Sequence, residues 1–209
     1  MAGTTIGIRD EIAALKRTRI LAAAADLFYD NGYENTTLDA VAERLGVSKP
    51  FIYAHFSSKA ELLAEICSRG IASSLEALDQ ALALDASPGL KLEALSKGFA
   101  SAVLQSQTYI AIFSREEKNL RPEDFDRIND MRRDFDRKLT DLLRQGVELG
   151  EFTLSDAHMA ALGIGGMVSW AYVWYRKSGR LSIPQVADEM SGLILAMVQY
   201  RPRAGRKAG

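Results

Sequence analysis

The stretch from Lys49 to His55, reading KPFIYAH, places a cation among aromatic side chains. If it is helical, Ile52 and Phe56 lie four residues apart on one face and point into a core. A Phe and a Tyr beside a Lys make a poor solvated surface but suit a DNA groove. Apolar atoms contact thymine methyl groups, Lys reaches guanine acceptors, and Tyr bonds a phosphate. The residues left outward on this helix are Lys49, Pro50, Phe51, Tyr53 and His55.

Caps and turns around this stretch predict three short helical pieces between Thr36 and Leu63. Thr36 or Thr37 caps the first piece, which Gly46 ends by taking the left-handed conformation. Ser48 caps the second piece, in whose first turn Pro50 is tolerated. Two short helices around a glycine-containing turn describe a helix-turn-helix, and the second helix of that motif reads the major groove.

Basic residues flank this motif on both sides. Lys59 lies at the start of the next helix, where its charge and the free N–H groups both favour a phosphate. Lys16, Arg17 and Arg19 lie near the beginning of the preceding helix. Either they form an ordinary solvated face, or they contact the DNA backbone.

The segment from about residue 12 to 68 resembles the DNA-binding domain of the TetR family of one-component bacterial regulators. The resemblance rests on Phe28-Tyr29-x-x-Gly32-Tyr33, Thr36-Thr37, Val41-Ala42, Leu45-Gly46-Val47-Ser48, Tyr53-x-His55-Phe56 and Lys59-x-x-Leu62. It implies a dimeric repressor that leaves its operator when a small ligand binds the C-terminal domain. The positions that match the family's DNA contacts are Thr37, Lys49, Pro50, Phe51, Tyr53, His55 and Lys59, to which we add the cap Ser48. Phe51 stands where the family often has a small residue, so the family's base preference does not transfer.

The overall composition sets limits on function. The chain has 209 residues and a formal net charge of −1, so affinity for nucleic acid must come from local charge. Cys67 is the single cysteine, which excludes an internal disulfide and favours a reducing cytoplasm. We expect no catalytic residue, metal ligand or cofactor, because no phosphate loop, catalytic triad or metal-binding spacing is present. With no leader and no membrane-spanning run, we expect a cytoplasmic protein without a membrane partner.

Helical periodicity continues through the rest of the chain and predicts an all-α protein of about nine helices. Expected parts are a mobile arm (1–10), a helix-turn-helix domain (11–58), a linking helix (59–84), a ligand-binding and dimerisation domain (85–200) and a disordered basic tail (201–209). The run from Ala157 to about Lys177 is apolar nearly all round and should be a helix buried on more than one side. The resemblance implies that this helix and the last one pair with their twins in a homodimer, through residues such as Gly166, Leu193 and Met197.

The second domain should enclose a hydrophobic small-molecule effector. We expect the cavity walls to include Phe99, Val103, Phe113, Phe135, Leu139, Met167, Trp170 and Trp174. Arg132, Arg133 or Arg176 could meet an anionic part of the ligand or form solvated surface. Weak resemblance to branches tied to lipid, steroid or aromatic catabolism suggests an acyl-CoA or a related catabolite. The alternatives are a drug-sensing repressor of an efflux pump, and a helical binding protein or bundle enzyme without an operator.

Overall fold

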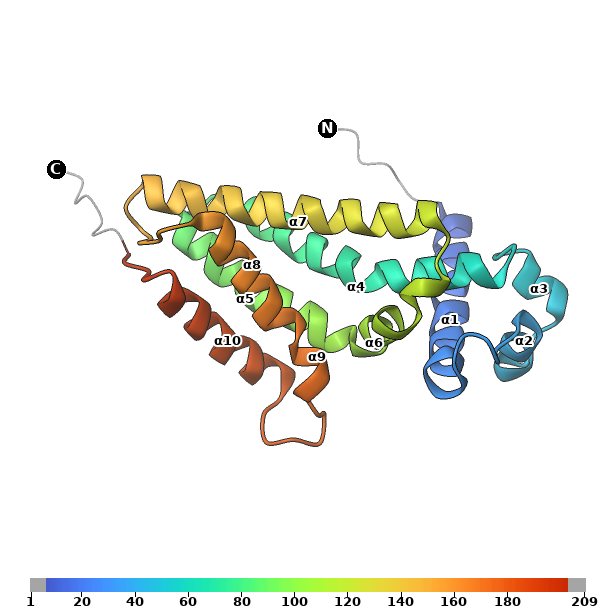
Figure 1. Ribbon diagram of the computed structural model, residues 1–209. Helices are drawn as coiled ribbons and strands as arrows, with labels where there is room; N and C mark the ends of the chain where they lie inside the picture. The colour runs from blue at the N-terminus through green and yellow to red at the C-terminus, as the bar shows by residue number, and fades with distance from the viewer. Residues whose placement is uncertain (1–6, 203–209) are drawn as a thin grey trace. The chain divides into compact units, whose positions relative to one another are not determined.

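The computed structural model describes residues 7–202, and every regular element within them is helical (Figure 1). The predicted all-α class is confirmed. The elements are α1 (Ile8–Asn31), α2 (Leu38–Leu45), α3 (Lys49–Tyr53), α4 (Lys59–Leu82), α5 (Pro88–Gln105), α6 (Gln107–Glu116), the 3-10 turn η1 (Glu117–Asn119), α7 (Pro122–Glu148), α8 (Ala157–Ser169), α9 (Ala171–Trp174) and α10 (Ile183–Met197). Most of the predicted arm and tail lies outside the described residues. The prediction of an arm up to residue 10 was too long, because α1 begins at Ile8.

The helices form two compact units that are not continuous in sequence. Unit 1 consists of residues 1–68 and 108–125, and unit 2 of residues 69–107 and 126–209. Residues 108–125 therefore pack with the N-terminal helices, although the sequence pattern assigned them to the second domain. Helix α4 contributes its first residues to unit 1 and its later residues to unit 2.

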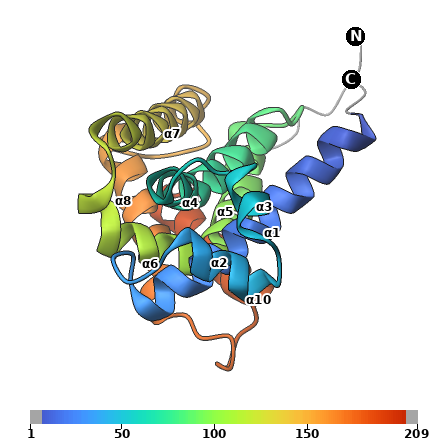
Figure 2. The same ribbon diagram turned by 90° about the vertical axis from the view of Figure 1, so that its right-hand side faces the viewer.

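Unit 1 is built on the second half of α1, with α2, α3 and the start of α4 (Figure 2). Its core consists of fully buried apolar side chains, among them Ile20, Leu21, Phe28, Val41, Ile52, Phe56, Leu62 and Leu63. The first half of α1 lies outside this core: Ile12 and Leu15 are 47% and 63% exposed, and the packed part of this helix begins at Ile20.

Unit 2 is a bundle in which α5 packs along α10 and also contacts α8 and α9. Phe99 of α5 and Phe135 of α7 meet in its core, with ring centroids 4.7 Å apart. The buried carboxylate of Glu151 accepts hydrogen bonds from the Gly89 N–H at 2.8 Å and the Ser87 hydroxyl at 3.0 Å. This carboxylate satisfies free donors at the start of α5.

The helix expected from Ala157 to about Lys177 is in fact broken. Helix α8 ends at Ser169 and the short α9 follows from Ala171, with Trp170 between them. Only Ala161, Ile164 and Val168 of α8 are buried, so this helix has one buried face rather than several. None of the helices in residues 7–202 is long and apolar enough to cross a membrane.

Candidate nucleic-acid interface

The turn between α2 and α3 has the geometry of a helix-turn-helix. Thr37 caps α2 by accepting a hydrogen bond from the Ala40 N–H at 3.1 Å. Gly46 ends the same helix with a φ of 66°, a left-handed conformation that most side chains resist. Ser48 precedes α3 and is exposed, and its hydroxyl makes no capping bond. The hydroxyl of Thr37 still has its own proton to donate, so both hydroxyls can serve an external acceptor.

Helix α3 presents the face that the sequence predicts. Ile52 and Phe56 are buried, at 0% and 1% exposure, whereas Tyr53 is 53% exposed. Lys49 and Pro50 are exposed as well, and Phe51 and His55 are half-buried. The rings of Phe51 and His55 meet edge to face, with centroids 5.2 Å apart. The inward and outward orientations are confirmed, while contact of these residues with DNA stays a prediction.

Lys49 already has an acidic partner within the motif. Its Nζ lies 2.5 Å from Oδ2 of Asp39 on α2, and both side chains remain largely exposed. The hydrogen bond and the charge of Asp39 raise the pKa of Lys49 above 10.5. The ammonium group of Lys49 is therefore paired with a carboxylate of the same motif.

Lys59 contacts its own chain rather than projecting freely from α4. Its Nζ donates to the backbone carbonyl of Tyr33 at 3.0 Å and to that of Glu34 at 3.3 Å. The same ammonium lies 4.2 Å from the centre of the Tyr33 ring. No sequence pattern predicts this role, in which Lys59 holds the turn between α1 and α2.

The structure separates the three basic residues of α1. Lys16 and Arg19 are exposed and, with Phe51, line a hollow of about 200 Å³ that also includes Ile20, Leu45 and Val47. The Lys16 Nζ lies 5.6 Å from the centre of the Phe51 ring. Arg17 instead turns toward the interior of unit 1. Thus two of these cations adjoin the outward face of α3, and the third does not.

The residues expected to form the effector cavity come from both units. Phe99, Val103, Phe135 and Leu139 are buried in unit 2, and Met167 is half-buried. Phe113 is buried too, but it belongs to unit 1. Trp170, which follows the last residue of α8, is 62% exposed in the single chain, and Trp174 at the end of α9 is 49% exposed, so their place in an effector site stays a prediction.

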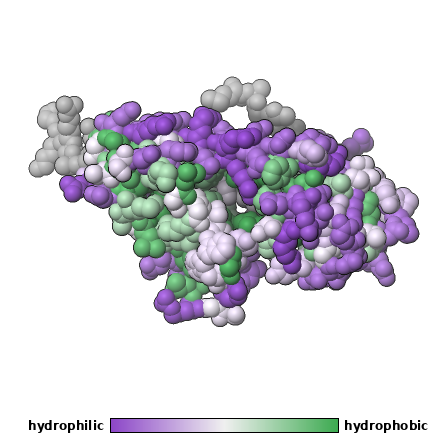
Figure 3. Space-filling view, in the orientation of Figure 1, coloured by the Kyte–Doolittle hydropathy of each residue, from purple (hydrophilic) through white to green (hydrophobic). Residues whose placement is uncertain are grey.

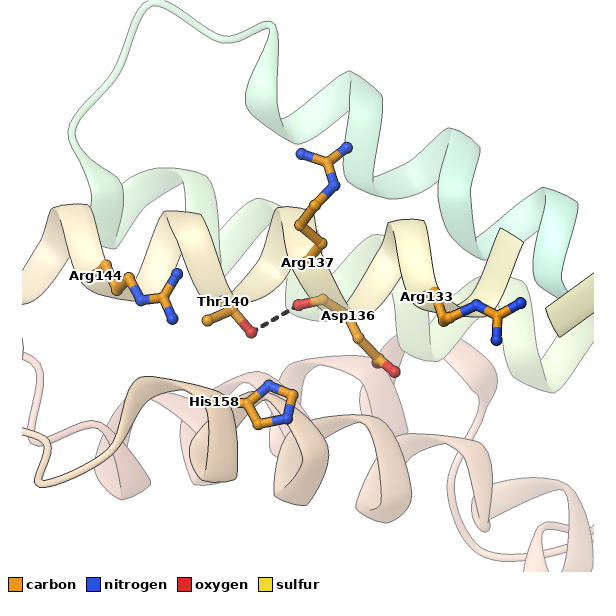
Figure 4. A pocket seen from close by; sticks show the side chains of 6 residues that line it. All are labelled: Arg133, Asp136, Arg137, Thr140, Arg144 and His158. Atoms are coloured by element: carbon orange, nitrogen blue, oxygen red, sulfur yellow. Dashed lines mark hydrogen bonds between the residues drawn. The ribbon is translucent and has the colours of Figure 1, made fainter. Parts of the chain in front are cut away.

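A hollow in unit 2 has a different, polar lining. It has a volume of about 300 Å³ and lies between α7 and the start of α8 (Figure 4). Its walls are Arg133, Asp136, Arg137, Thr140, Arg144 and His158. Burial raises the pKa of Asp136, and the nearby charges of His158 and Arg132 oppose that rise. Guanidinium and imidazole groups of this kind can bind an anion, although Arg133, Arg137 and Arg144 also form ion pairs along α7.

An apolar stripe lies uncovered on α8 and α10. Met159 and Leu162 on α8 and Trp170 just after it are exposed, as are Leu193 and Met197 on α10, at 59% and 41%. Gly166 lies on the same side of α8, and nothing comes within 4 Å of the Cβ that another residue would place there. Hydrophobic residues gather over this part of unit 2 in Figure 3, whereas the edge formed by α7 is hydrophilic. Such a surface is typical of a protein–protein interface.

Comparisons with known proteins point to one family. Residues 20–66 match the model of bacterial regulatory proteins of the tetR family, and residues 85–198 match the tetracyclin repressor-like C-terminal domain. The transcriptional activator FasR of Mycolicibacterium smegmatis is 36% identical over 109 residues, which cover 52% of this chain and 48% of FasR. The transcriptional repressor KstR2 of Rhodococcus jostii is 27% identical over 182 residues, which cover 86% of this chain and 89% of KstR2.

One similar solved structure contains both operator DNA and a small molecule. AibR in complex with isovaleryl coenzyme A and operator DNA has a TM-score of 0.71 and 28% identity, covering 85% of this chain and 97% of AibR. The helix-turn-helix, the all-helical second unit and the two family matches lead to the same assignment. The chain belongs to the TetR family of DNA-binding transcriptional regulators, which are not enzymes.

Proposed function

We propose that this protein is a ligand-responsive repressor that binds operator DNA through the outward face of α3. The observation that carries this proposal is the division of α3 into a buried side and an exposed side. The buried side holds Ile52, and the exposed side presents Lys49 and Tyr53. Thr37, Ser48, Pro50, Phe51, His55 and Lys59 complete the proposed contact set. Repression rather than activation is supported by KstR2, a repressor that aligns with most of the chain, whereas FasR aligns with half.

We further propose that two copies bind the operator as a homodimer through α8 and α10. Gly166, Leu193 and Met197 lie on the exposed apolar stripe and would be covered by the partner. A two-fold dimer presents two recognition helices to half-sites about one helical turn, or roughly 34 Å, apart.

For the effector, we propose an acyl-CoA thioester with a hydrophobic acyl group. The AibR complex supports this class, because isovaleryl coenzyme A joins a short apolar chain to an anionic carrier. In unit 2, the buried side chains of Phe99, Val103, Phe135 and Leu139 and the half-buried Met167 would adapt to the acyl group. Trp170 and Trp174 would contribute at its margin, and the hollow with Arg133 and His158 would hold phosphate.

The proposal is tested first with DNA and then with thioesters. Wild-type protein is used to select duplexes from a random library, and the selected duplex and a shuffled duplex of equal length are compared by fluorescence anisotropy. We expect tight, salt-dependent and sequence-specific binding, which isovaleryl coenzyme A or a longer acyl-CoA weakens. If no duplex is enriched, operator binding is excluded. If free fatty acids or cationic drugs cause release and thioesters do not, the effector class is wrong.

A further inference from the structure

Arg17 of α1 connects three parts of unit 1 that are far apart in sequence. One guanidinium nitrogen, Nη1, donates to the backbone carbonyl of His55, just beyond the end of α3. The other, Nη2, donates to the carboxylate of Glu65 on α4 and lies 3.6 Å from Oε1 of Glu61. The central carbon of the guanidinium group lies over the Phe56 ring, 4.1 Å from the ring centre. A single side chain thus joins the end of α3 to the first turns of α4.

The need for such a connection follows from the length of α3. This helix has five residues, and so short a helix takes its orientation from its surroundings rather than from its own hydrogen bonds. Its inner side is held by Ile52 and Phe56. The carbonyl of His55 is a backbone group at its end, where an intrahelical donor is missing. Arg17 supplies that donor and carries the positive charge that attracts Glu61 and Glu65.

The loop between α3 and α4 is held by the same group of residues. The Glu61 carboxylate accepts hydrogen bonds from the Ser57 N–H and the Ser57 hydroxyl, both at 2.8 Å. The Glu61 N–H donates to the Ser58 hydroxyl at 3.1 Å, which caps α4. Arg17 is close to this carboxylate as well, so the loop and both flanking helices form one polar network.

The side chains of Lys16 and Arg19 have different surroundings from that of Arg17. Lys16 and Arg19 are exposed beside Phe51, whereas Arg17 is 35% exposed and has carbonyl and carboxylate partners. A guanidinium group can donate in two directions while stacking on a ring, and a lysine ammonium cannot reproduce that planar arrangement. The three cations should therefore respond differently to the same substitution.

We propose that Arg17 is a positioning residue for the recognition helix: it fixes α3 against α4 and thereby determines how well the protein distinguishes its operator from other DNA. The inference rests on the proposed operator binding. Specific recognition needs the side chains of α3 at defined positions in the groove, whereas non-specific binding needs only charge near the phosphates. Loss of Arg17 contacts should thus reduce specificity more than general DNA affinity.

The test is a matched pair, Arg17→Lys and Arg19→Lys, which both retain the charge. Each full-length variant is titrated with the duplex selected by wild-type protein and with a shuffled duplex at several salt concentrations. We expect Arg17→Lys to lower specific affinity by about tenfold, the effect of one poorly matched base contact, with shuffled-DNA affinity and salt slope unchanged. Arg19→Lys should bind both duplexes as the wild type does.

Glu65→Gln provides a second variant that leaves Arg17 in place and removes the charge of its partner. Glu65→Gln should also lower the ratio of specific to non-specific DNA affinity. In the double variant with Arg17→Lys, the loss should be smaller than the sum of the two single losses. If Arg17→Lys keeps the wild-type ratio of specific to non-specific DNA affinity, the proposal is overturned. So would an equal loss on both duplexes with a smaller salt slope, which would identify Arg17 as a phosphate contact. If the wild-type protein itself shows no sequence preference, the proposed function fails, and that result is distinct from either outcome.

Discussion

Nζ of Lys49 and Oδ2 of Asp39 lie 2.5 Å apart, which joins the two helices of the helix-turn-helix by an exposed ion pair. In a DNA complex, Asp39 would repel phosphates and compete for the ammonium group of Lys49. If α3 binds DNA as proposed, this ion pair lowers the affinity of the protein for DNA.

Asp39→Asn should increase affinity for the selected and shuffled duplexes alike. The substitution removes a repulsive charge and frees Lys49, so the salt slope should become steeper by about one. Anisotropy titrations over a range of salt concentrations measure both quantities, and thermal unfolding should change little because exposed ion pairs stabilise weakly. An unchanged slope would mean that Lys49 does not reach a phosphate.

Lys49→Ala combined with Tyr53→Ala should abolish operator binding while the protein stays folded and dimeric. Both side chains are exposed on α3, so their loss removes DNA contacts without opening the core. The matched control is Ile52→Ala on the buried side, which should lower the free energy of unfolding by about 2–5 kcal/mol. Near-normal operator affinity in the double variant would show that another surface binds DNA.

Leu193→Glu combined with Met197→Glu should give a folded monomer. In the single chain these side chains are 59% and 41% exposed, so the new charges disturb only a surface that a partner covers. Light scattering gives the mass, and Leu84→Glu, at a residue 43% exposed in the turn that follows α4, is the control. A dimer that survives both changes would place the interface elsewhere.

Glu61→Gln should destabilise the protein at neutral pH and have a smaller effect in acid. Burial raises the pKa of Glu61, but hydrogen bonds from Ser57 and the nearby Arg17 outweigh it, so the pKa lies below 4.5. A lowered carboxyl pKa means that the charged form stabilises the fold above the unfolded pKa, and that this contribution is lost as pH falls through the folded value. Denaturant unfolding from pH 7 to pH 3 should show the two proteins converging. If the difference in the free energy of unfolding between the two proteins does not change with pH, the effect comes from the shape of the side chain rather than from its charge.

Phe135→Ala should lower the free energy of unfolding by about 3–5 kcal/mol, the cost of truncating a buried aromatic side chain. Phe135 is 3% exposed and contacts Phe99 in the core of unit 2.

Trp170→Ala should lower the free energy of unfolding far less than Phe135→Ala and should instead raise the effector concentration needed for operator release. Denaturant unfolding and release assays measure the two effects. A release midpoint unchanged by Trp170→Ala would remove this residue from the effector site.

The local signals of the helix-turn-helix were sufficient to predict its structure. The sequence predicted a cap at Thr36 or Thr37, of which the structure uses Thr37. That cap, Gly46 and the apolar pair Ile52 and Phe56 each act over a few residues, so local sequence is enough to predict them. The interactions of Lys59 and Arg17 could not be predicted in this way. Their partners, the Tyr33 carbonyl and the Glu65 carboxylate, are 26 and 48 residues away, and no periodicity encodes such distances.

Predictions for the second half were less accurate for a related reason. An apolar run does not reveal whether its residues are covered by their own chain or by a partner, so Trp170 was expected to be inside. The break at this residue and its exposure show that hydrophobicity alone does not assign a side chain to the core.

Because the tryptophans are exposed in the single chain, their fluorescence should report dimer formation. The chain has 2 tryptophans, and both lie in the segment that follows α8, close in sequence to the proposed partner surface. Indole emission shifts to shorter wavelength when water leaves the ring. Dilution through the dissociation range should therefore move the emission maximum to the red without any attached dye. The same signal would follow assembly in crude mixtures and in stopped-flow experiments, where larger labels would obstruct the contact being observed.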